Sequence, residues 1–396
     1  MRIAIYGGSF NPPHIGHVEA ARSACEQLKP DRFLIIPTNI PPHKEMEENS
    51  PSPETRQEFA RLAFRDIPGA EISDMEIRRE GKSYTADTVD ILRQRFPEDE
   101  LCIVMGTDMF LSFKTWFRWQ HLVEECTLAV LSREADDASE IAAFRSELAR
   151  ECGARVILMA HEPLPMSSTE IRRSLRLRQG AELVPEAVYA RILQTGSYGA
   201  KAELSWLRAH SRPYLKPKRV KHVEGVEREA VKLARRWGED ADTAAEAGIL
   251  HDITKSLPHE KQLKLCEKYG IMLEAAERET PALLHAITGA AFSRELFGIS
   301  DAVYGAIRWH TTGKPEMSLL EKIVYLADYI EPTRDFEGIK KLRKLSFEDL
   351  DAAMALGLKM SLEEIRARGD EPFRDTVDAC AWYSRLQAIK EEEKTC

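Results

Sequence analysis

Two histidines near the start of the chain, His14 and His17, are three residues apart in the segment 7–17, GGSFNPPHIGH. This segment follows the apolar run 3–6 and leads into a helical pattern, so both imidazoles can face one point from the first helical turn. Glycines there let the backbone approach a ligand, and a helix N-terminus offers free N–H groups to phosphate. The pattern predicts a triphosphate site and differs from the G-x-G-x-x-G of dehydrogenases; the alternative is a plain strand–turn–helix with incidental histidines.

Two later segments could bring positive charge to such a site. Ser167 and Glu170 have the spacing of a capping box, which by itself indicates only the start of a helix. Arg172, expected in the first turn of that helix, adds a planar fork of donors for phosphate oxygens. Lys44 follows the second expected strand, at the edge where open α/β sheets bind ligands. Taken alone, an exposed loop lysine is the simpler interpretation of Lys44.

The second half of the chain carries a different set of titratable residues. They are His222, His251, Asp252, His285, His310 and Asp328. A lone helical histidine is usually a core or surface residue, but the pair at 251–252 follows an apolar run and is expected to be buried, which is costly for a free carboxylate. Asp328 lies inside the apolar helical segment 323–330 with no nearby base, so a bound cation is the simplest compensation. Imidazole and carboxylate together suit Fe, Mn, Zn or similar ions.

Two kinds of secondary structure must position these residues. The first half alternates strand-like runs, one of them expected over 70–77, with helical patterns, which predicts a parallel sheet covered on both faces. The second half has almost no period-2 segments, and helical patterns such as 347–367 dominate it, which predicts an all-α fold. The sequence GSYG at 196–199, beside the boundary expected near 197–201, suggests a flexible joint. We therefore expect two domains, 1–198 and 203–392.

Composition narrows the class of protein. The 396 residues carry a net charge of -9, so a broad electrostatic grip on nucleic acid is not expected, and any anion must be held by a local basic cluster. The seven cysteines are scattered, odd in number and never form C-x-x-C, which favours a reducing cytoplasm over a disulfide framework. No signal-peptide pattern and no membrane-length apolar run are present. We expect a cytoplasmic protein with small-molecule partners, as a monomer or a homo-oligomer.

The motifs of the first half resemble a known family. The segments 14–17 (HIGH) and 167–172 (SSTEIR) resemble the H-x-G-H and S-x-x-x-I-R motifs of nucleotidyltransferases. Further segments narrow the resemblance to bacterial nicotinate-nucleotide adenylyltransferase: 7–14 (GGSFNPPH), 41–44 (PPHK), 83–88 (SYTADT), 106–108 (GTD) and 114–116 (KTW). Pantetheine and cytidylyl relatives share only the H-x-G-H part. The resemblance implies a Rossmann-like α/β fold over about residues 1–198.

That resemblance also implies a reaction. A phosphate oxygen of nicotinate mononucleotide attacks the α-phosphorus of ATP, pyrophosphate leaves, and Mg²⁺ accompanies the ATP. Catalysis would be positioning and charge neutralisation by His14, His17, Lys44 and Arg172. The residues implied at ATP are Gly7, Gly8, Ser9, Phe10, His14, His17, Asp108, Ser167, Ser168 and Arg172. Those implied at the nicotinate nucleotide are Lys44, Tyr84, Thr85 and Trp116.

Three of these roles are more detailed. Trp116 would stack on the nicotinate ring, with a place in the core as the alternative. Backbone amides near Thr85 would meet the nicotinate carboxylate. Asp108 would contact a ribose or the metal.

The second half resembles the HD superfamily, in which a histidine, a His-Asp pair and a distant Asp follow one another on helices. Its segments 285–290 (HAITGA), 309–315 (WHTTGKP) and 327–332 (ADYIEP) are similar to bacterial HD phosphohydrolases that cleave diadenosine tetraphosphate symmetrically to two ADP. The resemblance implies six metal ligands and two divalent ions, with Fe or Mn favoured. The ligands would be His222, His251, Asp252, His285, His310 and Asp328.

Within that set, Asp252 would bridge the two ions as a catalytic group, and His285 and His310 would serve the second ion. Lys255 and Arg334 are implied phosphate contacts, while the basic run 216–221 is equally well explained as a solvated helix face. Together the two resemblances predict a bifunctional enzyme acting on ATP, nicotinate mononucleotide and diadenosine tetraphosphate. The alternatives are an HD half that senses nucleotides, or one that hydrolyses guanosine tetraphosphate or a cyclic dinucleotide.

Overall fold

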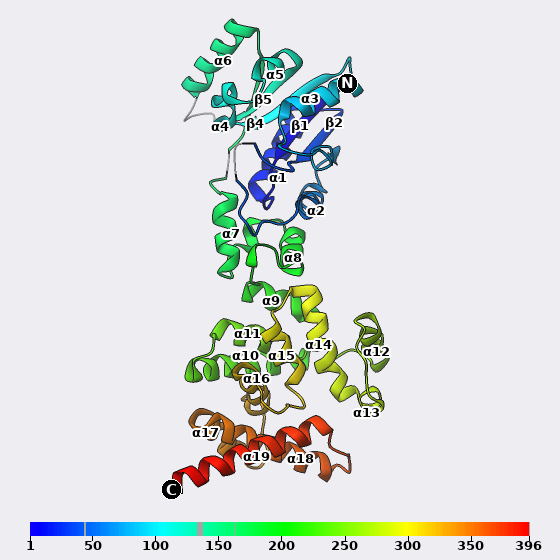
Figure 1. The fold of residues 1–396 in the computed structure, drawn as a ribbon, viewed down its shortest axis with the longest axis vertical. Coiled ribbons are helices and arrows are strands. Elements are labelled where there is room, and N and C mark those ends of the chain that lie inside the picture. The colour runs from blue at the N-terminus through cyan, green and yellow to red at the C-terminus, as the bar shows by residue number, and fades with distance from the viewer. Residues whose placement is uncertain (43–44, 133–137, 163, 396) are drawn as a thin grey trace. The chain divides into compact units, whose positions relative to one another are not determined.

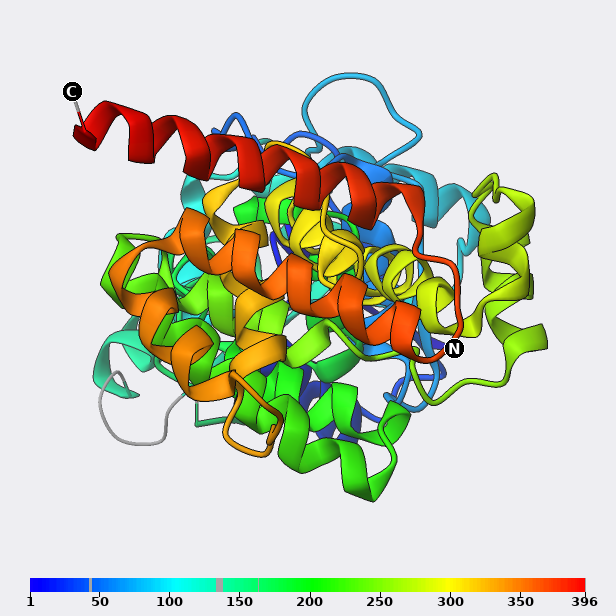
Figure 2. The same ribbon diagram turned by 90° about the horizontal axis from the view of Figure 1, so that it is seen from below.

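The computed structural model describes residues 1–42, 45–132, 138–162 and 164–395. The chain divides into two compact units, Met1–Ala200 and Lys201–Cys396. The first unit contains strands and helices, and the second consists of helices (Figures 1 and 2).

The first unit is built on a six-stranded parallel sheet (Figure 1). Its strands are β1 (Arg2–Gly8), β2 (Arg32–Pro37), β3 (Ala70–Ile72), β4 (Glu100–Gly106), β5 (Cys126–Ser132) and β6 (Arg155–Ala160). The order β3-β2-β1-β4-β5-β6 is that of a Rossmann fold, and it reverses between β1 and β4. Ile5 of β1 pairs with Leu34 on one side and with Ile103 on the other. Ligands of such sheets bind beyond the carboxyl ends of the strands at this reversal.

Helices accompany the strands because the strands are apolar on both faces. They are α1 (Ile15–Leu28), α2 (Pro53–Phe64), α3 (Thr85–Arg95), α4 (Thr107–Leu111), α5 (Trp119–Glu125), α6 (Ala138–Cys152), α7 (Ser168–Arg176) and α8 (Glu186–Gln194). Leu92 of α3 and Leu122 of α5 share a buried cluster with Ile103 and Val130 of the sheet. The predicted α/β fold of the first half is confirmed.

One predicted strand is shorter than expected. The apolar run 70–77 suggested a strand over its whole length, but β3 ends at Ile72. Ser73 still donates its N–H to Ile35 O, 2.9 Å away. The next donor on that side of β2 would be Pro37, which has no N–H, so the ladder stops there.

The second unit consists of helices. They are α9 (Leu204–Ser211), α10 (Pro217–Trp237), α11 (Ala241–Leu250), α12 (His259–Lys268), α13 (Ala275–Glu279), α14 (Pro281–Phe297), α15 (Asp301–Trp309), α16 (Leu319–Ile330), α17 (Ile339–Glu348), α18 (Leu350–Ala367) and α19 (Arg374–Thr395). α10 packs on α11 and α16, and α15 packs on α14 and α16. Figure 2 shows α18 and α19 lying side by side. The predicted all-α second half is confirmed.

The segment 347–367 differs from the single helix expected there. α17 ends at Glu348 and α18 begins at Leu350, because Asp349 is extended and its side chain accepts the N–H of Ala352 at 3.0 Å. Aspartate in this position caps the first turn of a helix. Among the described residues, no helix is long and apolar enough to cross a membrane.

Candidate functional site

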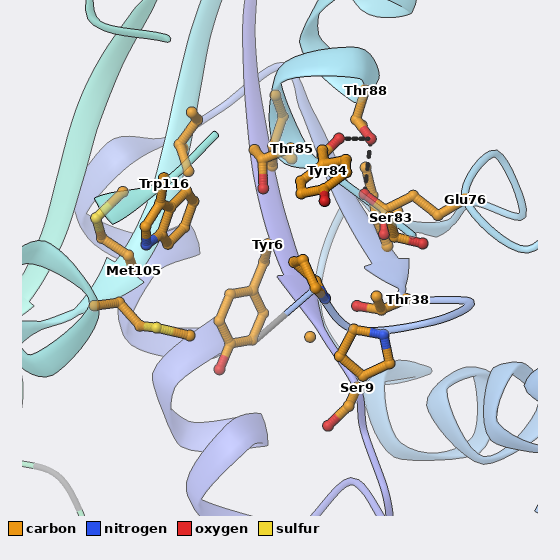
Figure 3. A pocket seen from close by; sticks show the side chains of 18 of the residues that line it. Tyr6, Ser9, Thr38, Glu76, Ser83, Tyr84, Thr85, Thr88, Met105 and Trp116 are labelled. Carbon is orange, nitrogen blue, oxygen red and sulfur yellow. Dashed lines mark hydrogen bonds between the residues drawn. The ribbon is translucent and has the colours of Figure 1, made fainter. Parts of the chain in front are cut away.

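A cavity of about 380 Å³ lies at the carboxyl ends of β1 and β4, where the strand order reverses (Figure 3). Seven of the residues predicted to bind nucleotides line it: Gly7, Gly8, Ser9, His17, Tyr84, Thr85 and Trp116. They come from the end of β1, the first turn of α1, the start of α3 and the loop before α5. The volume lies in the range of small-ligand sites.

The two histidines of the H-x-G-H segment are stacked on each other. Their ring centroids are 3.7 Å apart, and the backbone N–H of His14 donates to Nδ1 of His17 at 3.2 Å. A neutral His17 must then carry its proton on Nε2, where it can be donated to a ligand. Burial lowers the pKa of His14 to about 4, and burial together with His14 holds the pKa of His17 well below its usual value. Both imidazoles are therefore neutral, and each has one N–H to donate.

Glycine and an aromatic ring hold this pair in place. A Cβ on Gly16 would lie 3.1 Å from Nδ1 of His14, so a larger residue there would push on the ring. Phe10 is buried with a left-handed φ of 44°, and its ring contacts that of His17 edge to face at a centroid distance of 5.3 Å. Phe10 is not among the cavity-lining residues. It supports His17 from behind.

The residues predicted around α7 lie beside the H-x-G-H segment. Ser167 caps α7 by accepting the N–H of Glu170 at 3.2 Å, and Ser168 donates to Pro12 O at 3.4 Å. Arg172 is buried in the second turn of α7, not the first. Its guanidinium donates to Asn11 O at 2.8 Å and to Thr169 Oγ1 at 3.1 Å, and it pairs with Glu47.

Other predicted nucleotide contacts are not in the wall of the cavity. Ser167, Ser168 and Arg172 adjoin the H-x-G-H segment, and His14 belongs to it, but none of the four lines the cavity. Asp108 is exposed in the first turn of α4 and does not line the cavity either. Lys44 lies outside the described residues.

Aromatic side chains form part of the cavity wall, and one of them, Trp116, also packs against the core. Trp116 is partly buried against the core, with its ring 5.4 Å from that of Phe113, and it also lines the cavity. The Tyr84 ring contacts the Phe117 ring at a centroid distance of 4.6 Å. Thr85 is the first residue of α3, so free backbone N–H groups are available beside both rings.

Glu76 also lines this cavity, and sequence reasoning missed it. Its carboxyl is buried and accepts the hydroxyl proton of Thr88 at 2.7 Å (Figure 3). Burial raises the pKa of Glu76 to about 7. No sequence signal pointed to it, because the segment around it was expected to be a strand.

In the second unit, five elements bring the six predicted ligands together. His222 lies on α10, His251 and Asp252 follow α11, His285 lies on α14, His310 follows α15, and Asp328 lies on α16. Two groups have ligand atoms that all lie within 4.8 Å of one another. They are His222 with His251 and Asp328, and His251 with Asp252 and His310.

Asp252 lies at the centre of this cluster. Its Oδ2 is 3.5 Å from Nε2 of His222 and 3.4 Å from Nε2 of His251. Its Oδ1 is 3.2 Å from Nε2 of His285 and 3.7 Å from Nε2 of His310. The side chain is only 1% exposed, yet neither oxygen has a hydrogen-bond partner among the described residues. Burial alone would raise the pKa of Asp252, but the surrounding imidazoles hold it well below its usual value.

The imidazoles are oriented as metal ligands. The Nδ1 atoms of His251 and His310 donate to backbone carbonyls at 2.8 and 2.7 Å, and Nδ1 of His222 donates to Glu331 at 3.1 Å. In the neutral state each of these rings presents a lone pair on Nε2. The Nε2 atoms of His222 and His251 are 3.3 Å apart, and Nε2 of His222 lies 3.1 Å from Oδ1 of Asp328. Burial opposes protonation of His222, but hydrogen bonds to Asp252, Asp328 and Glu331 raise its pKa to about 9, so Nε2 carries a proton without a metal ion. A cation can take the place of that proton between the same imidazoles and carboxylates, so the residues present fit a metal site.

A cavity of about 460 Å³ beside the cluster contains both predicted phosphate contacts. Lys255 and Arg334 line it together with Lys216, Lys218 and Arg219. Nζ of Lys255 lies 3.1 Å from Nε2 of His285. Nη1 of Arg219 lies 3.2 Å from Oδ2 of Asp252. Arg219 was part of the basic run with no single role assigned, although its position three residues before His222 places both on one helix face.

Asp328 has a basic partner that the sequence did not suggest. Its segment was taken to lack a nearby base, but Arg334 donates to Oδ1 of Asp328 at 2.8 Å and to its carbonyl at 3.1 Å. The chain turns back after α16, so this partner comes from beyond the helix. Asp328 still lies 3.1 Å from Nε2 of His222. Burial opposes ionisation, yet hydrogen bonding to His222 and the nearby His251 and Arg334 hold the pKa of Asp328 well below its usual value.

Comparison with known proteins agrees with this division. The cytidylyltransferase-like family matches residues 5–174, and the HD domain matches residues 219–333. A "Probable nicotinate-nucleotide adenylyltransferase" of Geobacter sulfurreducens is 36% identical over 48% of this chain and 94% of its own length. A "Probable nicotinate-nucleotide adenylyltransferase/Ap4A hydrolase" of Mycoplasma pneumoniae is 29% identical over 90% of this chain and 97% of its own length.

A solved structure is similar to part of the chain. It is a "predicted HD superfamily hydrolase involved in NAD metabolism" from Clostridium acetobutylicum, 36% identical, covering 47% of this chain and 100% of its own, with a TM-score of 0.46. The family is shown by the sequence matches. The chain therefore belongs to the nicotinate-nucleotide adenylyltransferase family, and its second half carries an HD domain.

Proposed function

We propose that the chain is a bifunctional enzyme with a transferase domain over residues 1–198 and a hydrolase domain over residues 203–392. The first joins nicotinate mononucleotide to the adenylyl group of ATP and releases pyrophosphate. The second hydrolyses diadenosine tetraphosphate to two ADP. The relative from Mycoplasma pneumoniae, whose name joins these two activities, supports the pairing.

The main support for the transferase is the cavity at the point where the strand order reverses. The β1 glycines, His17, Thr85 and Trp116 all line it. Nε2–H of His17 donates to the phosphates of ATP, which Mg²⁺ accompanies. Trp116 stacks on the nicotinate ring, and the free amides at the start of α3 bind its carboxylate. With both substrates held there, the phosphate oxygen of the mononucleotide attacks the α-phosphorus in line.

Arg172 and Lys44 neutralise the charge that develops on the leaving pyrophosphate. Arg172 is paired with Glu47 and buried beside the H-x-G-H segment. A phosphate oxygen can take the place of the Glu47 carboxylate on this guanidinium, because both are anionic acceptors.

The main support for the hydrolase is the position of Asp252. Each of its two carboxylate oxygens faces a pair of imidazole Nε2 atoms. We infer that two divalent ions, Mn or Fe, are held there by His222, His251, Asp252, His285, His310 and Asp328. When bound, such ions activate water and hold the phosphate under attack. Lys255, Arg334 and Arg219 line the adjoining cavity and bind the rest of the polyphosphate chain.

A product assay on the full chain tests both halves. With nicotinate mononucleotide and ATP, we expect nicotinate adenine dinucleotide and pyrophosphate. With diadenosine tetraphosphate and Mn²⁺, we expect ADP alone; ATP and AMP together would exclude symmetrical cleavage. Bound nucleotide without any turnover would instead make the HD half a sensor, and turnover only of guanosine tetraphosphate would change its substrate.

A further inference from the structure

Glu331 is a fully buried carboxylate at the end of α16 that no catalytic role explains. It accepts Nδ1–H of His222 at 3.1 Å on Oε1, and the same oxygen accepts the hydroxyl of Thr333. Its Oε2 accepts the backbone N–H of Thr333 at 2.7 Å. These three hydrogen bonds hold the Glu331 carboxylate in one orientation.

A glycine on the opposite helix makes room for it. Gly225 lies on α10, three residues after His222 and on the same face of that helix. A Cβ at this position would lie 2.6 Å from Oε2 of Glu331, closer than any tolerated contact. Glycine at this position of α10 therefore leaves the space that the Glu331 carboxylate occupies beside His222.

We propose that Glu331 is a positioning residue that fixes the ring and the tautomer of His222, so that Nε2 presents its lone pair to the metal site. The proposal rests on the proposed metal site and adds a residue that does not touch the ion. Carboxylates in this position orient metal-bound histidines in other proteins, and losing one typically weakens metal binding about 10- to 100-fold.

Replacing Glu331 by Gln makes the sharpest test, because size and burial stay the same. The N–H of Thr333 can only donate, so the amide oxygen of Gln must face it. The NH₂ group then faces Nδ1 of His222 and the Thr333 hydroxyl, both of which can accept. Nδ1 of His222 becomes an acceptor, its proton moves to Nε2, and the lone pair for the ion is lost.

Glu321 offers a matched control on the same helix. It is also buried, it also lies under a glycine, with a Cβ on Gly305 placed 2.8 Å from its Oε1, and it also accepts a backbone N–H, that of Ser318 at 2.7 Å. Its charged partner is Lys314, whose Nζ lies 3.3 Å from Oε1 of Glu321. Among the described residues, no hydrogen bond or ion pair joins Glu321 to a predicted metal ligand. Glu321→Gln therefore repeats the chemical change without reaching the cluster.

The experiment titrates Co²⁺ into metal-free full-length protein and follows its visible absorption, which reports the ligand set. We expect Glu331→Gln to weaken Co²⁺ binding at the His222 side about 10- to 100-fold and to shift the spectrum toward that of His222→Ala. Gly225→Ala should act in the same direction, since it displaces the carboxylate without removing it. Glu321→Gln and Gly305→Ala should keep the wild-type spectrum and affinity within about twofold.

The outcomes separate this inference from the proposed function. If the wild-type chain binds no Co²⁺, the metal site and the role of Glu331 both fall. If it binds Co²⁺ and Glu331→Gln does so with unchanged affinity and spectrum, only the role of Glu331 falls. Thermal unfolding of the metal-free variants shows whether a loss comes from unfolding; a loss shared equally by the Glu321→Gln control would also overturn the proposal.

Discussion

Glu76 places a carboxyl group with an unusual proton affinity on the wall of the nucleotide cavity. Its partner Thr88 stabilises it with one hydrogen bond, but burial dominates and raises the pKa to about 7. Near neutral pH the side chain is therefore divided between its two forms. The neutral form is the more compatible with an anionic substrate in the same cavity.

This shift predicts a pH dependence of stability. The folded chain binds the Glu76 proton more tightly than the unfolded chain, whose reference pKa is 4.5. The stabilisation is therefore complete below about pH 4.5 and is lost as pH rises toward about 7. Glu76→Gln should remove this slope and raise the free energy of unfolding at pH 8 by about 1–3 kcal/mol.

Denaturant unfolding of the full chain at several pH values measures it. Glu80→Gln, at an exposed neighbouring position, should keep the wild-type slope. A Glu76→Gln variant whose stability falls between pH 5 and 7 as steeply as that of the wild type would contradict the assignment.

For single residues, the sequence predicts metal ligands better than it predicts the residues that position them. His251-Asp252 and Asp328 stood out because such residues are rare within apolar helical segments, and the structure brings their side chains together. Glu331 lay inside a quoted segment but had no assigned role, because its partner His222 is far away in sequence. Glu76 was missed because its segment was expected to be a strand, and its burial comes from packing that no local pattern encodes.

Among the elements, the alternation of strands with helices in the first half and the all-α second half followed from periodicity, while boundaries did not. The end of β3 depends on Pro37 in the neighbouring strand, which is not visible in the run 70–77 itself. The break between α17 and α18 depends on Asp349 leaving the helical conformation to cap the next helix. An apolar pattern that continues across both helices hides such a break.

The cap predicts the effect of a substitution. Asp349→Ala should lower the free energy of unfolding by about 1 kcal/mol, because the N–H of Ala352 loses its acceptor. Chemical denaturation measures this loss. Asp349→Asn is the matched control, since Asn caps about as well as Asp and should keep most of the stability. An equal loss in both variants would point instead to the Lys390 ion pair, whose Nζ lies 3.8 Å from Asp349.

For the whole molecule, the proposal requires two sites that work by different means. The first site binds phosphate through neutral imidazoles and backbone amides, and the second through cations held by buried carboxylates and imidazoles. His17→Ala should reduce adenylyl transfer by about 100-fold or more while leaving diadenosine tetraphosphate hydrolysis near normal. Asp252→Ala should have the opposite pattern. Equal loss of both activities in either variant would refute independent sites.

Metal exchange separates the two sites without any substitution. Four of the six predicted ligands in the second unit are imidazoles, which suit Mn, Fe or Zn, whereas Mg²⁺ prefers oxygen ligands such as those of ATP. Protein stripped with a chelator and resupplied with Mg²⁺ alone should regain dinucleotide synthesis but not hydrolysis. Adding Mn²⁺ should restore hydrolysis, measured as ADP released. If Mg²⁺ alone restored full hydrolysis, the histidines around Asp252 would not be the ligands of the catalytic ion. The ion would then have to be bound by oxygen ligands instead.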